Sequence, residues 1–249
     1  MLTATRQARI LDSLRADGEV SVDVLADQFG VSLSTIRRDL NTLSTEGFLR
    51  RVRGGGSVEL DKIPFSDVEQ QQRSEKALVA ERAAELVNEG DVILVDIGTT
   101  TALFARQLRG RRITVITSSL AVIDQLRDDD VVELIVLGGV VRKNYKSMVG
   151  ALTEQALAQI RATTCFLGTS GVRPDGTIAD TTGMEVPVKL AMIESSLRAV
   201  VLADASKFPG VGLLSVCGPE KIWGIVTNHD ADPATLQVFR DQKVVVMTA

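Results

Sequence analysis

Short apolar runs alternate with helical stretches through the last 160 or so residues, and this alternation restricts the possible folds more than any other feature. The apolar runs, rich in Val, Ile and Leu, are 92–95, 113–117, 131–137, 165–167, 199–203, 225–227 and 244–247. The helical stretches between them are 101–108, 120–127, 153–161, 187–197 and 233–242. Continuous apolar strands separated by amphipathic helices are typical of a mainly parallel sheet with helices on both faces. A further helix is expected over 66–88, before the first run.

Glycines and hydroxyl side chains follow four of these runs. After the first run, Asp96 and Ile97 lead to Gly98 and three threonines, which open the next helix. Ligands bind at the carboxyl ends of parallel strands, and a helix N-terminus attracts anions, so we expect a phosphate-binding pocket here. Its expected members are Asp96, Gly98, Thr99, Thr100, Thr101, Ser118, Ser119, Gly138, Gly139, Gly168, Thr169 and Ser170. Ordinary helix capping by Thr and Ser is the alternative, and the lysine and glycine spacing of a nucleotide P-loop are missing.

Three charged residues complete the expected pocket. Lys207 follows a strand and supplies a cation that balances a phosphate. Glu185 and Lys189 are four residues apart, on one face of an expected helix. For this pair the sequence leaves open a plain surface salt bridge.

The first sixty residues predict three helices and a hairpin. The first helix spans 6–14, and the second is capped by Ser21 with Val24, Leu25 and Phe29 on its inner face. The third runs from Ser32 to about residue 46, with Ile36, Leu40 and Leu43 facing the core. Ser32 caps this helix, and its opposite face presents Ser34, Thr35, Arg37, Arg38 and Asn41. We expect all six residues to contact DNA.

Two extended runs around the glycines 54–56 predict a β-hairpin, or wing, that carries Arg50, Arg51 and Arg53. Residues 31–58 contain five arginines and only two acidic residues, although the chain has a net charge of −4. A local basic patch suffices for DNA, because phosphate attraction is screened over about 10 Å. Helix, turn, exposed basic helix and basic wing together predict a winged helix-turn-helix whose third helix enters the major groove.

The segment from Val31 to Leu40, with Leu43, Gly47, Leu49, Arg51 and Gly54-Gly55, closely resembles the DNA-binding signature of the DeoR family of repressors. From about residue 74 onward the chain resembles the DeoR effector domain, which is similar in fold to ribose-5-phosphate isomerase. The motifs are Glu75-Lys76, Gly90-Asp91, Asp96 to Thr101, Gly138-Gly139, Val149-Gly150, Lys189 and Asp204 to Phe208. The resemblance implies a phosphorylated sugar as effector. Arg53, Ser118 and Asn228 depart from the family pattern, where histidine, asparagine and aspartate are common.

The expected organisation is a winged helix-turn-helix domain at 1–60, a linker and the start of a connecting helix at 61–73, and a Rossmann-like α/β effector domain at 74–249. We expect a repressor of carbohydrate-metabolism genes with no catalytic residues, metal or cofactor. It would be a homo-oligomer, dimer or tetramer, because two-fold operators need paired reading heads. Two cysteines far apart and no long uncharged apolar stretch favour a cytoplasmic protein without a membrane span.

Two other hypotheses stay open at this stage. One is an active phosphosugar isomerase with a regulatory DNA module, for which Asp96, Asp204 and Glu185 are the candidate general bases. The other is a protein-interaction module with a vestigial DNA-binding domain. Turnover on sugar phosphates and operator binding by Arg37 and Arg38 variants separate the three.

Overall fold

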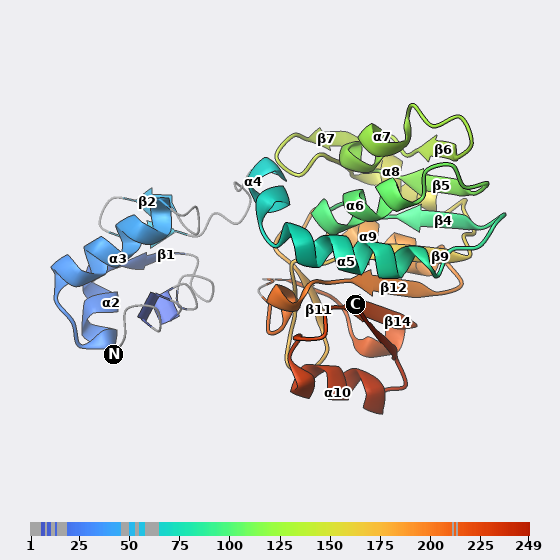
Figure 1. Cartoon of the computed structure of the whole chain (residues 1–249). Helices are drawn as coiled ribbons and strands as arrows, with labels where there is room; N and C mark the ends of the chain where they lie inside the picture. The colour runs from blue at the N-terminus through green and yellow to red at the C-terminus, as the bar shows by residue number, and fades with distance from the viewer. Residues whose placement is uncertain are drawn as a thin grey trace. The chain divides into compact units, whose positions relative to one another are not determined.

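The computed structural model describes residues 6–7, 9–10, 13, 19–45, 50–52, 55–57, 65–210, 212 and 214–249. The chain divides into two units, Met1–Ile63 and Pro64–Ala249 (Figure 1).

All seven apolar runs become strands of one parallel sheet in the second unit, as the sequence predicts. In sheet order the strands are β15 (Val245–Thr248), β14 (Gly224–Thr227), β12 (Ala199–Leu202), β9 (Thr164–Gly168), β4 (Val92–Val95), β5 (Thr114–Thr117) and β6 (Glu133–Val136). Every neighbouring pair is parallel. The Rossmann-like α/β architecture is therefore confirmed.

The strand order reverses between β4 and β9. The chain passes from β4 to β5 and β6 on one side, then returns to place β9, β12, β14 and β15 on the other. The connections after β4 and after β9 therefore leave the sheet in opposite directions. In doubly wound folds, ligands bind outside the carboxyl ends of the strands at such a switch point.

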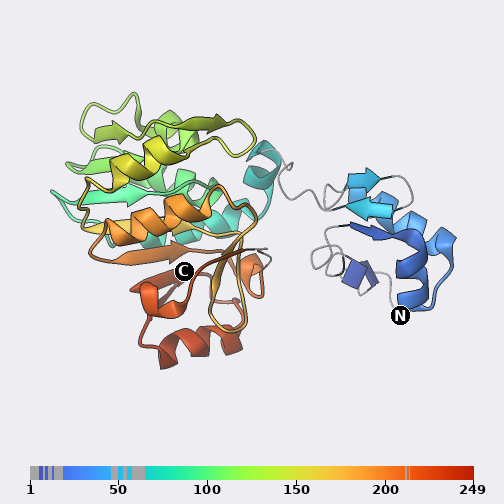
Figure 2. The same ribbon diagram turned by 180° about the vertical axis from the view of Figure 1, so that it is seen from behind.

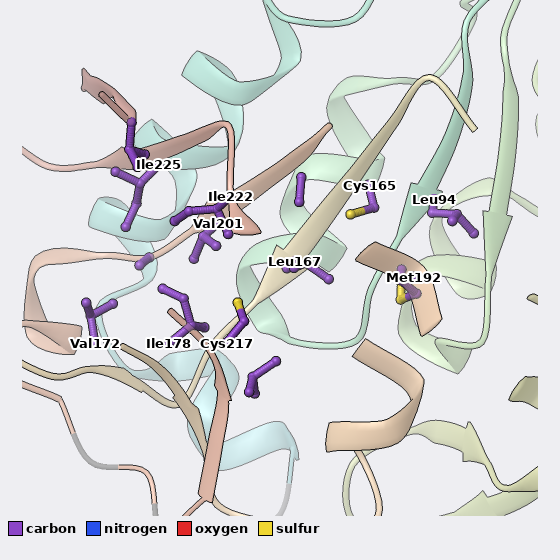
Figure 3. Close-up of a cluster of buried hydrophobic side chains, with 14 of the residues drawn as sticks. Leu94, Cys165, Leu167, Val172, Ile178, Met192, Val201, Cys217, Ile222 and Ile225 are labelled. Atoms are coloured by element: carbon purple, nitrogen blue, oxygen red, sulfur yellow. The ribbon is translucent and has the colours of Figure 1, made fainter. Parts of the chain in front are cut away.

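Helices cover both faces of the sheet (Figures 1 and 2). One face packs Ile93 and Val95 against α5 (Arg73–Ala84), α6 (Thr99–Gln107) and α7 (Leu120–Leu126). The other packs Leu94 and its neighbours against α8 (Ala151–Leu157), α9 (Val186–Glu194) and α10 (Pro233–Asp241). Figure 3 shows part of this second core. Because successive strand residues point to opposite faces, both faces of each strand must be apolar, which is why the runs are continuous.

Two small antiparallel sheets were not predicted from the sequence. One joins β10 (Gly171–Val172), β11 (Ile178–Asp180) and β13 (Leu214–Cys217). The other is the hairpin of β7 (Val140–Arg142) and β8 (Ser147–Val149). Strands of two to four residues with mixed polarity carry too little periodicity to be recognised.

The helix predicted over 66–88 is two helices, α4 (Phe65–Gln70) and α5, so that prediction was wrong in its continuity. The break lies at Gln72, whose φ of 50° is left-handed. Phe65 is buried against Ala102 of α6 and Ala121 of α7. Its N–H also donates to the carbonyl oxygen of Asn144, in the turn between β7 and β8, at 3.1 Å.

The first unit contains α2 (Val22–Phe29), α3 (Leu33–Thr45) and the strands β1 (Glu19–Ser21), β2 (Arg50–Val52) and β3 (Gly55–Ser57). The Ser21 hydroxyl accepts the N–H of Val24, which confirms it as the N-cap of α2. Ile36, Leu40 and Leu43 are buried, as predicted, in a core with Ile10 and Leu25. Val24 is exposed, so its predicted place on the inner face was wrong; Val22 and Ala26 are buried instead.

The predicted wing is present as the antiparallel pair β2 and β3, and β1 adds an unpredicted third strand. Gly55 lies in β3, not in the turn. A Cβ atom at Gly55 would lie 2.2 Å from the carbonyl oxygen of Val20 in β1, so the close approach of these strands requires glycine. The remaining parts of the predicted first helix, the predicted end of the third helix at Gly47, and Arg53 of the wing lie outside the described residues.

A buried ion pair connects the start of the first unit to α3. Arg6 donates from Nε to Asp39 Oδ2 at 2.5 Å and from its terminal nitrogen to Oδ1 at 3.2 Å. Both residues are buried. Asp39 therefore anchors the inner side of α3, while its neighbours Arg37 and Arg38 remain exposed.

We predict that Asp39→Ala destabilises the first unit by about 3 kcal/mol, because it leaves the Arg6 guanidinium buried without its partner. Hydrogen–deuterium exchange of peptides from α2 and α3 in the full chain measures this directly. Asp27→Ala, which removes an exposed acid from α2, is the control. Equal exchange in both variants would contradict the role given to the ion pair.

Candidate functional site

The first unit presents a polar face on α3. Arg37, Arg38 and Asn41 are exposed on the side of α3 that faces away from the buried Ile36 and Leu40. At the start of the helix, hydroxyl groups form a small network. Ser32 Oγ lies 2.8 Å from Ser34 Oγ and 2.9 Å from Thr35 Oγ1, and it accepts the N–H of Thr35 at 3.2 Å. The structure therefore brings together the six residues predicted on this helix.

The wing arginines are placed only in part. Arg50 and Arg51 lie in β2, which pairs with β3. Their side chains, and Arg53 altogether, lie outside what the structure describes. Their role in DNA contact stays a prediction.

At the switch point of the second unit, Asp96 and Lys189 form a fully buried ion pair. Lys189 Nζ donates to Asp96 Oδ2, and to the carbonyl oxygen of Gly168 at 2.8 Å. The N–H of Gly168 donates to the same carboxylate oxygen at 3.0 Å. Asp180 on β11 adds a second carboxylate, 3.4 Å from the ammonium nitrogen. This arrangement, the Asp96 cluster, joins the ends of β4 and β9 where the strand order reverses.

Burial and charge act in opposite directions in this cluster. Burial alone would lower the pKa of Lys189, but the carboxylates of Asp96 and Asp180 outweigh it, so the pKa is raised and the side chain is a cation. Burial raises the pKa of Asp96 against the attraction of Lys189. Each group therefore depends on the other for its charge.

Four buried polar atoms have no hydrogen-bond partner among the described residues, and all lie at carboxyl ends of the sheet. They are Asp96 Oδ1, Ser118 Oγ, Asp204 Oδ2 and Thr227 Oγ1. These atoms come from the ends of β4, β5, β12 and β14, while β9 between them ends at Gly168. Leaving such an atom unpaired costs about 1–3 kcal/mol, and four along five adjacent strands make this edge of the sheet the candidate site for a polar ligand.

The predicted phosphate cradle lies beside the Asp96 cluster. Gly98 precedes α6 with a φ of 131°, a conformation that glycine adopts most easily. Thr99, Thr100 and Thr101 form the first turn of this nine-residue helix and are buried. Thr101 Oγ1 donates to the carbonyl oxygen of Gly98 at 3.0 Å. The N–H groups of the first turn have no intrahelical partners by geometry, and they carry the positive end of the helix dipole.

Two residues that were not predicted as site members lie near Lys207. The ammonium of Lys76, on α5, is buried and donates to the carbonyl oxygen of Val68 at 2.6 Å. Burial and then the charge of Lys207 lower the pKa of Lys76 to about 8, against the attraction of Asp204. Asn228 accepts the N–H of Ala205 and donates to the carbonyl oxygen of Glu75, each at 3.1 Å. The charges of Lys207 and Asp204 therefore both act on the ammonium group of Lys76.

Glu185 is not part of a surface salt bridge with Lys189. It is buried, and its Oε1 accepts from Arg142 on β7 at 2.7 Å and from Ser147 on β8 at 2.8 Å. Arg142 also donates to Thr182 at 2.9 Å. Glu185 thus fixes the β7–β8 hairpin to the start of α9, while Lys189 turns to Asp96. The alternative of a surface salt bridge between Glu185 and Lys189 was therefore wrong. The actual partners of Glu185, on β7 and β8, lie 43 and 38 residues away in the sequence.

The remaining predicted residues have structural contacts of their own. Ser119 caps α7 by accepting the N–H of Val122. Gly138 accepts from Thr153, and Gly139 packs against Val149. Thr169 donates to the Gly171 and Ala179 carbonyl oxygens, and Ser170 reaches Asp180 at 3.4 Å. Of these, only Ser170 has a described contact with the Asp96 cluster.

We predict that Lys189→Met lowers the free energy of unfolding of the second unit by about 3 kcal/mol or more at pH 8, because Asp96 loses its cation. Without Lys189 the folded-state pKa of Asp96 rises further above its unfolded value. Stability is then retained below that pKa and lost as pH increases through it. The defect should therefore be smaller at pH 5. Urea unfolding followed by the fluorescence of Trp223 measures both, with the exposed Lys243→Met as control. A pH-independent defect would show that the ion pair does not control the site.

Comparisons with known proteins agree with both halves of this description. Residues 6–59 match the DeoR-like helix-turn-helix domain, and residues 71–229 match the DeoR C-terminal sensor domain. No helix of the described residues is long and apolar enough to cross a membrane, and no group of acidic, histidine or cysteine residues among them is arranged to hold a metal.

The chain is 31% identical to the uncharacterized HTH-type transcriptional regulator YulB of Bacillus subtilis, over 99% of this chain and 96% of that one. It is 28% identical to the glycerol-3-phosphate regulon repressor of Escherichia coli, over 98% of both. The solved structure of eIF2B beta from Chaetomium thermophilum has a TM-score of 0.50 at 19% identity, covering 68% of this chain and 54% of that one, and shows the fold alone. Both family domains match in this order, and the regulator of Bacillus subtilis is matched over nearly its whole length. The chain therefore belongs to the DeoR family of transcriptional regulators.

Proposed function

We propose that this chain is a DNA-binding repressor of carbohydrate-metabolism genes, and that a phosphorylated sugar bound at the switch point controls its affinity for the operator. The observation that carries the effector half is the row of four orphaned polar atoms beside a helix N-terminus and two ammonium groups. The name of the glycerol-3-phosphate regulon repressor supports a phosphorylated polyol or sugar as the class of ligand.

The chemistry of the site matches both ends of such a ligand. The orphaned carboxylate oxygens of Asp96 and Asp204 accept hydrogen bonds, which sugar hydroxyls donate. The hydroxyls of Ser118 and Thr227 donate or accept as the ligand requires. A phosphate group takes the N–H groups at the start of α6 together with the ammonium groups of Lys76 and Lys207.

The proposal includes binding without conversion. A general base must be free to take a proton from the substrate. Asp96 instead pairs with Lys189, and Glu185 accepts from Arg142 and Ser147. Asp204 Oδ1 accepts the N–H of Ser206 at 3.1 Å. Because Asp96 and Asp204 each keep one oxygen without a partner, the support for a sensor over an isomerase comes mainly from the relatives, which are transcriptional regulators.

Regulation follows from thermodynamic linkage. A ligand that binds one arrangement of the protein more tightly than another shifts the balance between them and thereby changes operator affinity. We propose a homo-oligomer, because paired reading heads match a two-fold operator, and a cytoplasmic location, where bacterial DNA is found.

We predict that Arg37→Ala with Arg38→Ala weakens operator binding at least tenfold, since each lost base contact costs about 1–3 kcal/mol. The operator is first selected from a random duplex library with the wild-type protein, and affinity is measured by fluorescence anisotropy at fixed salt. Arg106→Ala, which removes an exposed arginine from α6, should bind as the wild type does. Unchanged affinity in the double variant would favour a protein-interaction module instead.

We predict that one phosphorylated sugar in a panel that includes glycerol 3-phosphate raises the Tm by about 5 °C or more at saturating concentration. The same sugar without phosphate should give no shift. Lys76→Gln and Lys207→Gln should each abolish the shift, because the phosphate loses a cation, while the exposed Lys243→Gln should keep it. A Tm shift that persists in both variants would mean that the phosphate binds elsewhere. Turnover of the sugar, measured separately with the same protein samples, would favour the isomerase.

A further inference from the structure

The edge strand β6 presents a row of exposed apolar side chains. β6 is the last strand on its side of the seven-stranded sheet, with only β5 as a neighbour. Ile135 is 42% exposed and Val136 is 47% exposed. Val131 just before the strand, and Val140 and Val141 just after it on β7, are exposed as well. Figure 1 shows β6 and β7 at the same border of this unit, at the top of the view.

The backbone of β6 offers unused hydrogen-bonding groups along the same border. The N–H of Glu133 donates to Ile113, and the N–H of Leu137 donates to Thr117. In a parallel ladder the residues that face the neighbouring strand alternate. Leu134 and Val136 therefore direct their N–H and C=O groups away from β5, toward the open edge.

An edge of this kind pairs with another strand unless it is protected. Proteins protect edges with lysine, proline, bulges or a covering segment. Residues 131–141 contain neither lysine nor proline, and Glu133 is their one charged residue. No described strand lies on the outer side of β6. At the opposite edge, three of the four residues of β15 are partly covered, so β6 is the more open of the two.

We propose that β6 pairs antiparallel with β6 of a second copy of this chain, about a two-fold axis at Ile135, and that this contact forms the dimer. Leu134 of each copy then lies opposite the partner's Val136, in a hydrogen-bonded pair. The inference rests on the proposed function in one respect: a two-fold operator requires two reading heads in one particle.

Charge complementarity points to a second copy as the partner. The exposed Asp130 precedes the amino end of β6, where Asp128 is already paired with Arg127. The exposed Lys143 follows the carboxyl end of β6, in the turn between β7 and β8. Antiparallel pairing brings the amino end of one strand beside the carboxyl end of the other. Each acidic end therefore approaches the partner's Lys143, on both sides of the apolar centre. An isologous interface needs this self-complementary pattern.

Disulfide trapping in the full chain tests the register. Residues opposite each other in a non-hydrogen-bonded antiparallel pair have Cα atoms about 4.5 Å apart, within disulfide range. Ile135→Cys should therefore give a covalent dimer as the main product of mild oxidation with oxidised glutathione, seen on a non-reducing gel. Leu197→Cys, at a site 85% exposed in the loop before β12, is the control. The natural Cys165 and Cys217 are buried. Crosslinking no faster at position 135 than at position 197 would overturn the proposal.

Light scattering provides a second, independent reading. Val136→Lys adds an edge charge and should reduce the particle mass of the wild type by half, whereas Leu197→Lys should leave it unchanged. The inference would be contradicted if the wild type were monomeric at about 50 μM. It would also be contradicted if Val136→Lys had the same particle mass as the wild type. The Tm shift with the phosphorylated sugar is measured on the same samples. If that shift persists while no dimer is found, the interface is wrong and the proposed sensor function stands.

Discussion

The ion pair of Lys189 and Asp96 is the interaction on which the candidate site depends. It lies where the strand order reverses, and it joins α9, β4 and β9 through one ammonium group and one carboxylate. Removing two charges from water is costly unless they are paired and hydrogen-bonded. Lys189 achieves this with two carboxylates and a carbonyl oxygen. The position of the other site residues follows, because the loops after β4 and β9 are held together at this point.

The same geometry explains why the site is polar at the ends of an apolar sheet. Both faces of the strands are covered by helices, so their interiors must be apolar. Polar residues are tolerated only where the strands stop. There the sheet leaves Asp96, Ser118, Asp204 and Thr227 with unmet hydrogen-bonding capacity, a cost that a bound ligand would remove.

Sequence reasoning succeeded where a pattern is local and failed where partners are distant. The seven parallel strands were found because each is a continuous apolar run, and Ser21 was found because a cap lies next to its helix. The short strands β7 and β8 were missed because three residues do not show a period. Glu185 and Lys189 were singled out from the sequence, but their partners lie 43 and 93 residues away, so no spacing rule could find them. Lys76 was noted only as part of the motif Glu75-Lys76. Its burial depends on the break between α4 and α5, which the sequence did not predict.

Phe65 has a consequence for communication along the chain. It is among the first residues of the second unit, and it rests on Ala102 and Ala121, in the opening turns of α6 and α7. Those turns follow Gly98 and Ser118, so the entry of the chain into this unit and the candidate site share the same two helices. Energetic coupling between sites is reciprocal. A ligand at the candidate site that changes the packing of Phe65, and thereby the affinity for DNA, changes that affinity by some factor. Bound DNA must then change the affinity for the ligand by the same factor.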